Sequence, residues 1–233
     1  HYKIPVLYYI SPQIWAWKAG RIKTIKANVD HMAVILPFEK SIYEKAGVPV
    51  NYVGHPLAHH LNFHADKIKL RQILNLPSDK KIIALLPGSR KNEIERLMPV
   101  LVETMQLLLK KHPDLHFAIP VAGSINSSAI TQYLPSTPLP LHLFNQQARE
   151  VIAASDCVVV ASGTASLECA LLTIPGCIIY KASALTAWVA RKVIKISWLG
   201  LANIIAQKTL MPELLQNECN AVAISQKISS MLS

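Results

Sequence analysis

Two short segments of the sequence combine glycine, hydroxyl and charged residues in patterns that suit a phosphorylated ligand. The first is Gly88-Ser89-Arg90, which follows an apolar run and precedes a helical pattern. Glycine lets a ligand approach the backbone closely, and the free N–H groups at a helix start favour an anion. Serine offers a hydroxyl, and arginine adds planar donors that match phosphate oxygens. The alternative is an ordinary strand-to-helix loop whose Arg90 points into solvent.

The second segment is Ser162-Gly163-Thr164, followed one helical turn later by Glu168. The helix dipole alone can account for a carboxylate at that position. The functional interpretation is that Glu168 accepts hydrogen bonds from the two hydroxyls of a ribose, with phosphates on the turn before it. Two such turns together favour a nucleoside-diphosphate site. Neither matches G-x-G-x-x-G or a P-loop, so the sequence gives little support to a dinucleotide-binding or ATP-hydrolysing enzyme.

The elements that would position these turns alternate regularly between residues 81 and 180. Apolar runs predict strands, and apolar residues at helical spacing predict helices between them. This alternation indicates a parallel sheet covered on both faces, in which ligands bind at the carboxyl ends of the strands. The predicted strands are 81–87, 115–120, 139–144, 156–162 and 176–180, and the predicted helices are 92–108, 123–133, 146–154 and 164–172.

The first of these helices has a predicted start signal. Asn92 is expected to be its N-cap, with Glu95 three residues later as the acidic partner of a capping box. The Gly88-Ser89-Arg90 turn would then form the lip of the ligand-binding edge.

Residues 1–53 are expected to belong to a different α/β piece, with strand candidates at 5–10, 31–37 and 51–54. A polar stretch at 62–77 is the expected boundary. The predicted division is therefore 1–60 and 61–233.

The composition limits the classes of partner. The chain has 233 residues, of which 51% are hydrophobic and 16% charged, so it can build a packed core and is not a disordered chain. The formal net charge of +10 suits an anionic ligand, an anionic membrane surface or nucleic acid. No nucleic-acid-binding module is recognisable, so nucleic acid is not expected. The longest apolar region, 151–180, is interrupted by Asp156, Glu168 and Pro175 and is not expected to span a membrane.

Cysteine and histidine usage gives little support to a metal site. None of the four cysteines forms a C-x-x-C pair, which predicts buried free thiols in a reducing compartment. His55, His59, His60 and His64 have spacings that could bind a metal on a helix, but a polar surface between domains is the preferred interpretation. No signal peptide pattern is present, and the start at His1, directly before a strand candidate, suggests that an N-terminal portion is absent.

Two basic stretches carry tryptophan, at 14–26 and at 185–200. Aromatic and cationic residues together suit a lipid headgroup layer. Helices packed on a domain with a solvated charged side are the preferred alternative.

Several segments together resemble the lipid-A-disaccharide synthase family, from about residue 7 to about residue 219. The segments are SPQIWAWKAGRIKTIK, LPFEKSIYEKAGVPVNYVGHPL, LLPGSRKNEI, ASGTASLECAL and MPELLQ. The resemblance implies a GT-B-type α/β fold with Rossmann-like parallel sheets. Residues 1–60 would be the C-terminal part of the acceptor-side domain, and residues 61–233 the UDP-sugar donor domain with C-terminal helices.

The same resemblance implies a hexosyltransferase of lipid A biosynthesis, within the lipopolysaccharide pathway. It would transfer diacylglucosamine from UDP-2,3-diacylglucosamine to 2,3-diacylglucosamine 1-phosphate, giving a β-1,6-linked disaccharide with inversion. The enzyme would be cytoplasmic and peripheral on the anionic inner-membrane surface, with a homodimer as a further expectation. No cofactor and no metal are implied.

The resemblance also implies roles for individual residues. The Gly88-Ser89-Arg90 turn would bind the UDP pyrophosphate, the Ser162-Gly163-Thr164 turn would line the same edge, and Glu168 would hold the ribose. Asn203 lies where the family has a Pro-Asn-Leu-Leu-like segment, although Ala202 replaces the proline. The implied donor-binding set is Gly88, Ser89, Arg90, Ser162, Gly163, Thr164, Glu168, Asn203, Glu213 and Gln216.

One family feature is missing from the sequence. The N-terminal Gly-Glu-x-Ser-Gly-Asp-like motif does not occur, and neither does the carboxylate proposed as general base, which inverting transfer needs near the acceptor hydroxyl. The chain by itself is therefore expected to bind UDP but to turn over poorly or not at all. The alternatives are a sugar-nucleotide 2-epimerase of similar fold and a non-catalytic nucleotide- or lipid-binding fragment.

Overall fold

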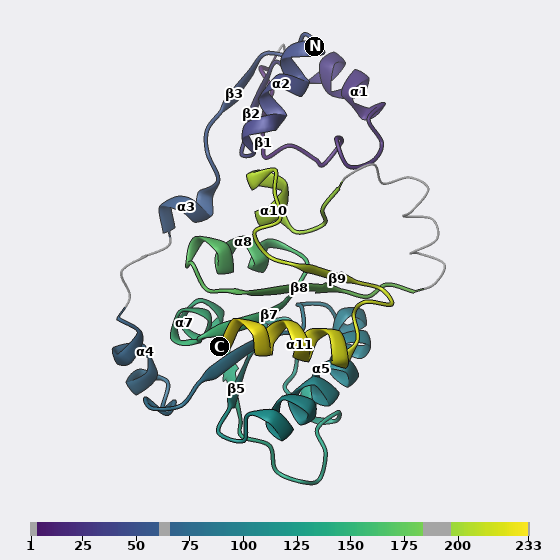
Figure 1. Ribbon diagram of the computed structural model, residues 1–233. Helices are drawn as coiled ribbons and strands as arrows, with labels where there is room; N and C mark the ends of the chain where they lie inside the picture. The colour runs from purple at the N-terminus through teal and green to yellow at the C-terminus, as the bar shows by residue number, and fades with distance from the viewer. Residues whose placement is uncertain (1–3, 61–65, 184–196, 233) are drawn as a thin grey trace. The chain divides into compact units, whose positions relative to one another are not determined.

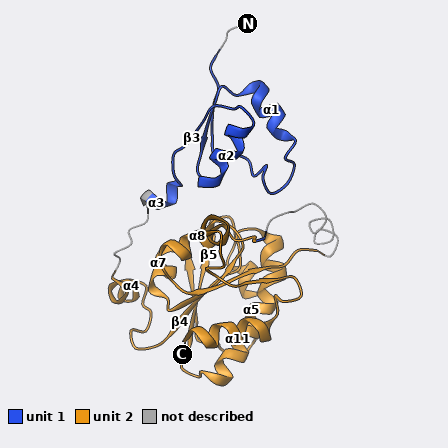
Figure 2. Ribbon diagram, turned by 45° about the horizontal axis from the view of Figure 1, so that its top comes forward, with its two compact units in different colours: residues 1–61, 185–197 blue, residues 62–184, 198–233 orange. Residues whose placement is uncertain are grey.

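The computed structural model describes residues 4–60, 66–183 and 197–232. The chain divides into two compact units, residues 1–61 with 185–197 and residues 62–184 with 198–233 (Figure 2). Each unit has its own parallel sheet and its own core. The α/β fold class with parallel sheets is therefore confirmed.

The first unit contains a three-stranded parallel sheet in the order β1-β2-β3. The central strand is the most buried, since Met32 and Val34 are fully enclosed and pack with Tyr43 of the following helix. The elements of this unit are β1 (Leu7–Tyr9), α1 (Arg21–Asn28), β2 (His31–Val34), α2 (Pro37–Lys45), β3 (Val50–Tyr52) and α3 (Pro56–His60).

The second unit contains a six-stranded sheet in the order β6-β5-β4-β7-β8-β9, and all of its neighbouring strands pair in parallel (Figure 1). Its strands are β4 (Ile82–Leu86), β5 (His116–Val121), β6 (Leu141–Asn145), β7 (Cys157–Ala161), β8 (Gly176–Tyr180) and β9 (Glu213–Leu215). Its described helices are α4 (Lys67–Ile73), α5 (Lys91–Lys111), α6 (Ser128–Thr131), α7 (Ala148–Ala154), α8 (Thr164–Leu171), α10 (Leu201–Ala206) and α11 (Ala221–Leu232).

Both faces of this sheet are covered, as its unbroken apolar strands require. Alternate residues of β4 show the division, because Ile83 and Leu85 belong to the core under α5 and α11 while Ile82 and Ala84 belong to the core under α4, α7 and α8. All five residues of β4 and of β7 are buried. Packing on both faces therefore fixes the positions of β4 and β7, and with them the points from which the following turns start.

The predicted start of the first long helix was wrong. Helix α5 begins at Lys91 with Arg90 as its N-cap, so Asn92 is inside the helix and Glu95 is not the capping partner. Arg90 has an extended backbone (φ −118°, ψ 143°), which brings Glu93 to the third helical position. The carboxylate of Glu93 then accepts the backbone N–H groups that the helix start leaves free.

The predicted helix at 123–133 is shorter than expected and is confined to Ser128–Thr131. The side chain of Asn126 accepts the backbone N–H of Ser128 at 3.0 Å, which stabilises a turn in place of an earlier helical start. The predicted buried free thiols are confirmed, since all four cysteines are buried and unpaired. Burial raises the pKa of the Cys157 thiol to about 11.

Candidate functional site

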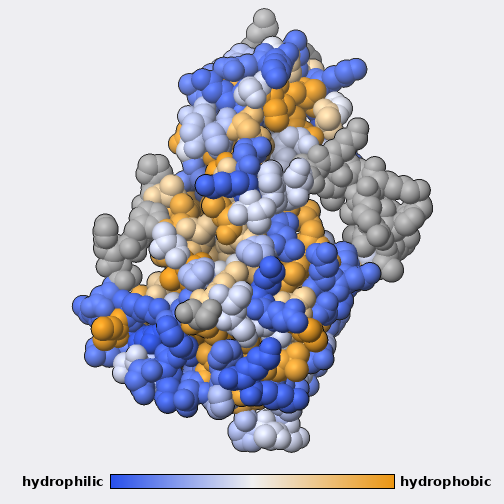
Figure 3. All heavy atoms as spheres, in the orientation of Figure 1, coloured by the Kyte–Doolittle hydropathy of each residue, from blue (hydrophilic) through white to orange (hydrophobic). Residues whose placement is uncertain are grey.

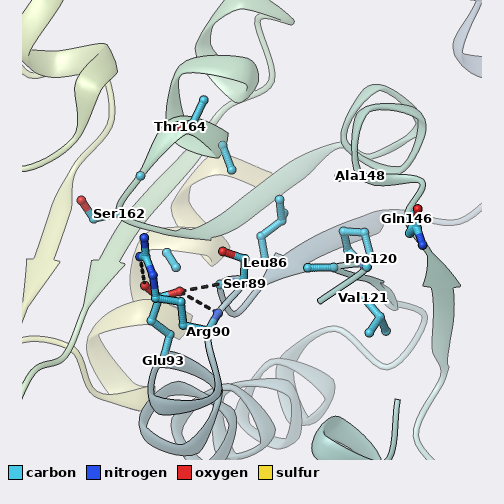
Figure 4. Close-up of a pocket in the computed structure, with 16 residues that line it drawn as sticks. Leu86, Ser89, Arg90, Glu93, Pro120, Val121, Gln146, Ala148, Ser162 and Thr164 are labelled. Carbon is cyan, nitrogen blue, oxygen red and sulfur yellow. Dashed lines mark hydrogen bonds and ion pairs between the residues drawn. The ribbon is translucent and has the colours of Figure 1, made fainter. Parts of the chain in front are cut away.

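A cavity of about 460 Å³ opens at the carboxyl edge of the second sheet, lined by residues that follow four neighbouring strands (Figure 4). Parallel strands end at the same edge, so their loops meet there. After β4 come Gly88, Ser89, Arg90 and Glu93, at the end of β5 Pro120 to Gly123, after β6 Gln146 and Ala148, and around the end of β7 Ala161 to Ala165.

The first turn of this cavity is shaped around Gly88 and Glu93. Gly88 has φ +107°, and a Cβ at this position would collide with the Glu93 carboxylate, so glycine is required. Glu93 Oε2 accepts the backbone N–H of Ser89 at 3.0 Å and that of Arg90 at 3.3 Å. Arg90 donates from Nη1 to Glu93 Oε1 at 2.9 Å, although its side chain is 80% exposed. The donors of this turn therefore converge on one point.

The second turn contributes Ser162, Gly163 and Thr164 to the same cavity. The Ser162 backbone N–H donates to Ile179 at 2.9 Å, and its hydroxyl donates to the Leu199 carbonyl at 3.1 Å. Gly163 and Thr164 are exposed at the start of α8. Because β4 and β7 are paired neighbours, the two predicted turns are brought together on one rim.

Glu168 is not among the residues that line this cavity. Its carboxylate accepts a hydrogen bond from Arg149 Nε at 3.3 Å, and its side chain is only 15% exposed. Arg149 comes from the first turn of α7. The role of Glu168 in holding a ribose stays a prediction.

Asn203 and Glu213 also lie outside the cavity lining, within a hydrogen-bond network. Asn203 is fully buried, donates to the Met211 carbonyl at 2.7 Å and to Glu213 Oε1 at 2.8 Å, and accepts the backbone N–H of Leu210 and Met211. These contacts fix the segment between α10 and β9. The roles of Asn203 and Glu213 in donor binding stay a prediction.

Glu213 connects this network to the second turn of the cavity. Its carboxylate accepts the backbone N–H groups of Leu199 and Gly200 at 2.8 and 3.0 Å. The Leu199 carbonyl in turn accepts the hydroxyl of Ser162. Gln216, from the same family segment, accepts the backbone N–H of Ala182 at 3.4 Å.

Several parts of the cavity lining were not predicted as site residues, among them Glu93, the end of β5, and Gln146. The loops after β5 and β6 could have been found, because they follow predicted strands 115–120 and 139–144 at the same sheet edge. Glu93 was missed because the helix start was placed two residues too late.

The first unit carries a buried carboxylate of its own. Glu39 is 1% exposed, and its burial raises its pKa even though Trp15 donates to it from Nε1 at 3.0 Å and the Leu36 N–H donates at 3.1 Å. Ser11 and Tyr43 share a 2.7 Å hydrogen bond beside it. These contacts hold the segment before α1 against α2.

The first basic stretch presents an exposed cationic surface with an aromatic residue. Trp17 is 47% exposed, and the Lys18 ammonium lies 4.5 Å from the centre of its ring. Arg21, Lys23 and Lys26 are exposed on α1. The second predicted stretch, 185–200, lies for the most part outside the described residues.

Two other sequence predictions concern a metal site at the histidine cluster and a membrane-spanning segment. His64 and the side chains of His59 and His60 lie outside what the structure describes. Within the described ranges, no group of three or more His, Cys, Asp or Glu side chains could hold a metal ion. None of the helices in those ranges has both the length and the apolar character to cross a bilayer.

Comparison with known proteins identifies close relatives. A family model described as "Lipid-A-disaccharide synthetase" matches residues 1–233. The chain is 52% identical over 227 residues to lipid-A-disaccharide synthase 1 of Legionella pneumophila (strain Paris), covering 97% of the chain and 59% of that protein. It is 42% identical over 229 residues to lipid-A-disaccharide synthase of Trichlorobacter lovleyi, covering 98% of the chain and 60% of that protein. The chain thus spans about three fifths of these relatives' length.

Solved structures with this fold include sugar-nucleotide enzymes. UDP-GlcNAc 2-epimerase of Neisseria meningitidis, bound to UDP-GlcNAc, superposes with a TM-score of 0.55 at 18% identity, over 99% of this chain and 70% of that one. The Methanocaldococcus jannaschii UDP-GlcNAc 2-epimerase, in complex with UDP-GlcNAc and UDP, gives a TM-score of 0.55 at 10% identity, over 89% and 55% of the two chains. At these identities the likeness concerns the fold alone.

Proposed function

Because the chain belongs to the lipid-A-disaccharide synthetase family, we propose that its second unit binds the UDP group of an acylated UDP-glucosamine for glycosyl transfer. The observation that carries this proposal is that both glycine-containing turns line one cavity of about 460 Å³. Backbone N–H groups and a guanidinium meet there, which are the donors that a diphosphate requires.

The residues of the cavity suggest a division of roles. Ser89 and Arg90 donate to the diphosphate, and the exposed Gly163-Thr164 start of α8 lies across from them on the neighbouring strand end. As the sugar leaves, negative charge grows on the diphosphate, and the fixed N–H groups and Arg90 stabilise that charge in the transition state. Ser162 stabilises the turn and does not contact the ligand through its hydroxyl, because that hydroxyl donates to the Leu199 carbonyl.

For the whole protein, the proposed reaction is the inverting, β-1,6 transfer from UDP-2,3-diacylglucosamine to 2,3-diacylglucosamine 1-phosphate. The chain spans 59% of the length of its Legionella relative, so the proposal for these 233 residues is donor binding. The homodimer also stays a prediction, and sedimentation velocity would test it by measuring the oligomeric state.

Replacing Arg90 by alanine tests the donor site. Loss of charge-assisted hydrogen bonds to the diphosphate is expected to weaken UDP binding about 10- to 100-fold. Isothermal titration calorimetry measures both dissociation constants. Arg96→Ala is the matched control, because Arg96 is exposed on the same helix but does not line the cavity. Equal UDP affinity of Arg90→Ala and the wild type would remove Arg90 from the site.

We further propose that the α1 surface of the first unit contacts the anionic headgroups of the cytoplasmic membrane leaflet. The first 29 residues contain five Lys or Arg and no Asp or Glu. Figure 3 shows hydrophilic and apolar residues interspersed over this unit, and Trp17 is an exposed aromatic beside the basic residues. An amphipathic aromatic ring and several cations suit the interface between headgroups and acyl chains.

Vesicle sedimentation tests this membrane contact. Binding to vesicles with phosphatidylglycerol is expected to fall with added salt and to drop about thirtyfold or more in Arg21→Glu/Lys23→Glu, since each of the two basic residues lost contributes about 1 kcal/mol. Lys69→Glu/Arg96→Glu makes the same charge change at exposed positions of the second unit and is expected to bind more strongly than the α1 variant. An equal loss of vesicle binding in both variants would show that net charge, and not the α1 surface, causes the effect.

A further inference from the structure

We propose that Glu93 is a specificity-determining residue of the donor cavity. Its carboxylate occupies the place where a phosphate would bind, and a ligand displaces it only if it offers more negative charge to the same donors. This inference rests on the proposed donor-binding function and adds a reason for the selection of a diphosphate.

The contacts of Glu93 are those expected of a bound anion. Its two oxygens accept two successive backbone N–H groups, of Ser89 and Arg90, and the Arg90 guanidinium (Figure 4). Successive N–H groups at a helix start combined with an arginine fork form a typical phosphate-binding arrangement. A phosphate and the Glu93 carboxylate therefore compete for the same three donors.

The shape of the turn shows how close the carboxylate lies. Gly88 has φ +107°, and any Cβ there would collide with Glu93 Oε2. The carboxylate thus lies directly against the backbone of the turn, within the cavity that both residues line. An incoming phosphate cannot reach this backbone while the carboxylate remains.

The surroundings allow the carboxylate to leave. The Glu93 side chain is 23% exposed and that of Arg90 is 80% exposed, so solvent reaches both side chains. The cavity of about 460 Å³ gives the side chain room to rotate. Hydrogen bonds and charge hold the Glu93 carboxylate at this turn, and a ligand that offers both to the same donors can replace it.

Competition of this kind selects by charge. A nucleoside monophosphate that expels Glu93 exchanges one anion for another and leaves a displaced carboxylate near itself. A diphosphate carries additional charge and a second group of oxygens, which can also reach the exposed start of α8. Glu93 therefore weakens the binding of a monophosphate more than that of a diphosphate.

A purely structural role of Glu93 leads to the opposite expectation. If the carboxylate only orders the turn and caps α5, its loss loosens the donors and weakens every phosphate ligand. The sign of the change in affinity separates the two roles.

The experiment is isothermal titration of UDP and UMP into the 233-residue chain and its Glu93→Gln variant. The neutral amide accepts hydrogen bonds more weakly than a carboxylate, so we expect tighter UMP binding by about three- to tenfold and a smaller gain for UDP. The preference for UDP over UMP should fall accordingly.

Glu95→Gln is the matched control, because Glu95 is exposed on the same helix, pairs with Lys91 at 3.9 Å and does not line the cavity. It should leave both affinities unchanged, and an equal gain in this variant would overturn the inference. Glu93→Asp keeps the charge but cannot reach all three donors, so it should bind UMP more tightly than the wild type. If circular dichroism shows that Glu93→Gln is unfolded, the UMP affinity of Glu93→Asp decides between the two roles of Glu93.

The failures of the two proposals are distinguishable. UDP binding to the wild type with equal or weaker UMP binding in the folded Glu93 variants would overturn the role of Glu93 alone. No UDP binding by the wild type or by any folded variant would overturn the proposed donor site, and the role of Glu93 with it.

Discussion

The carboxylate of Glu168 is oriented by Arg149, which donates to it at 3.3 Å from the neighbouring helix α7. A carboxylate held in this way keeps one oxygen and several lone pairs for further hydrogen bonds. The predicted ligand for these acceptors is the pair of ribose hydroxyls. At the scale of single residues, Arg149 would then be a positioning residue that acts through Glu168.

Glu168→Gln tests the ribose contact against a nucleotide that lacks one hydroxyl. The variant is expected to bind UDP about tenfold more weakly, because a hydrogen bond to a charged acceptor is lost. Its affinity for 2′-deoxy-UDP should change less, and calorimetry measures both. Glu150→Gln, an exposed acid on α7, is the control. An equal loss for both nucleotides would show that Glu168 does not contact the 2′-hydroxyl.

At the scale of elements, helix α4 is joined to the amino-terminal edge of the second sheet by a buried ion pair. Arg71 donates to Asp156 at 2.7 Å and to the carbonyls of Ala154, Ser78 and Lys80. Asp156 also accepts Lys67 Nζ and the backbone N–H of Ile82, each at 2.7 Å. All hydrogen-bonding groups of the pair are thus engaged, which makes removal of one partner costly.

The charge state of Asp156 makes this contribution depend on pH. Burial by itself raises the pKa of Asp156, but the hydrogen bonds from Lys67 and Ile82 and the charges of Lys67 and Arg71 outweigh it and hold the pKa below its ordinary value. A depressed pKa in the folded state stabilises the protein above the unfolded-state pKa of about 4. This stabilisation is lost as the pH falls through the folded-state pKa.

Asp156→Asn is therefore expected to lower the free energy of unfolding by about 2–4 kcal/mol at pH 7. The difference from the wild type should shrink as the pH falls from about 4 through the lowered folded-state pKa of Asp156, below which both proteins carry a neutral side chain. Urea unfolding at several pH values measures this. Asp114→Asn is the control, because Asp114 pairs with Lys80 at 3.2 Å but is 86% exposed. A pH-independent difference for Asp156→Asn would contradict the electrostatic explanation.

The division into two units with separate cores matters at the scale of the whole molecule. The first core is built around Tyr43 and the strand β2, while the second has a layer on each face of a six-stranded sheet. The proposed UDP site lies entirely within the second unit. A ligand that binds only one folded unit stabilises that unit directly.

Calorimetric melting is expected to resolve two transitions, one for each unit. UDP at about 100 times its Kd should raise the transition of the second unit by about 5 to 10 °C and leave the other in place. At the same UDP concentration, Arg90→Ala should reduce the shift to about half or less, because its affinity for UDP is expected to be about 10- to 100-fold lower. A single transition that moves as a whole would show that the units unfold together.

Much of the second unit could be predicted from the sequence because its elements have strong local signals. The run DCVVVAS is continuously apolar and β-branched, and it became the fully buried strand β7. The turns after β4 and β7 were also predictable locally, because Gly88 and Gly163 directly follow the apolar runs and glycine favours such turns. The capping error at Asn92 arose because asparagine is a preferred N-cap residue and has an acid three residues later, whereas the helix starts after Arg90 with Glu93 as the acid at the third position.

Local apolar periodicity was enough to predict the alternation of strands and helices, the parallel sheet and the residue types at its carboxyl edge. Tertiary structure decided which of these residues share a cavity. Pairing of β4 with β7 places residues 88–90 beside 162–164, whereas Asn203 became a buried structural amide and Glu168 the partner of Arg149. Hydrogen-bond partners far apart in the chain are chosen by packing, and no local pattern contains that information.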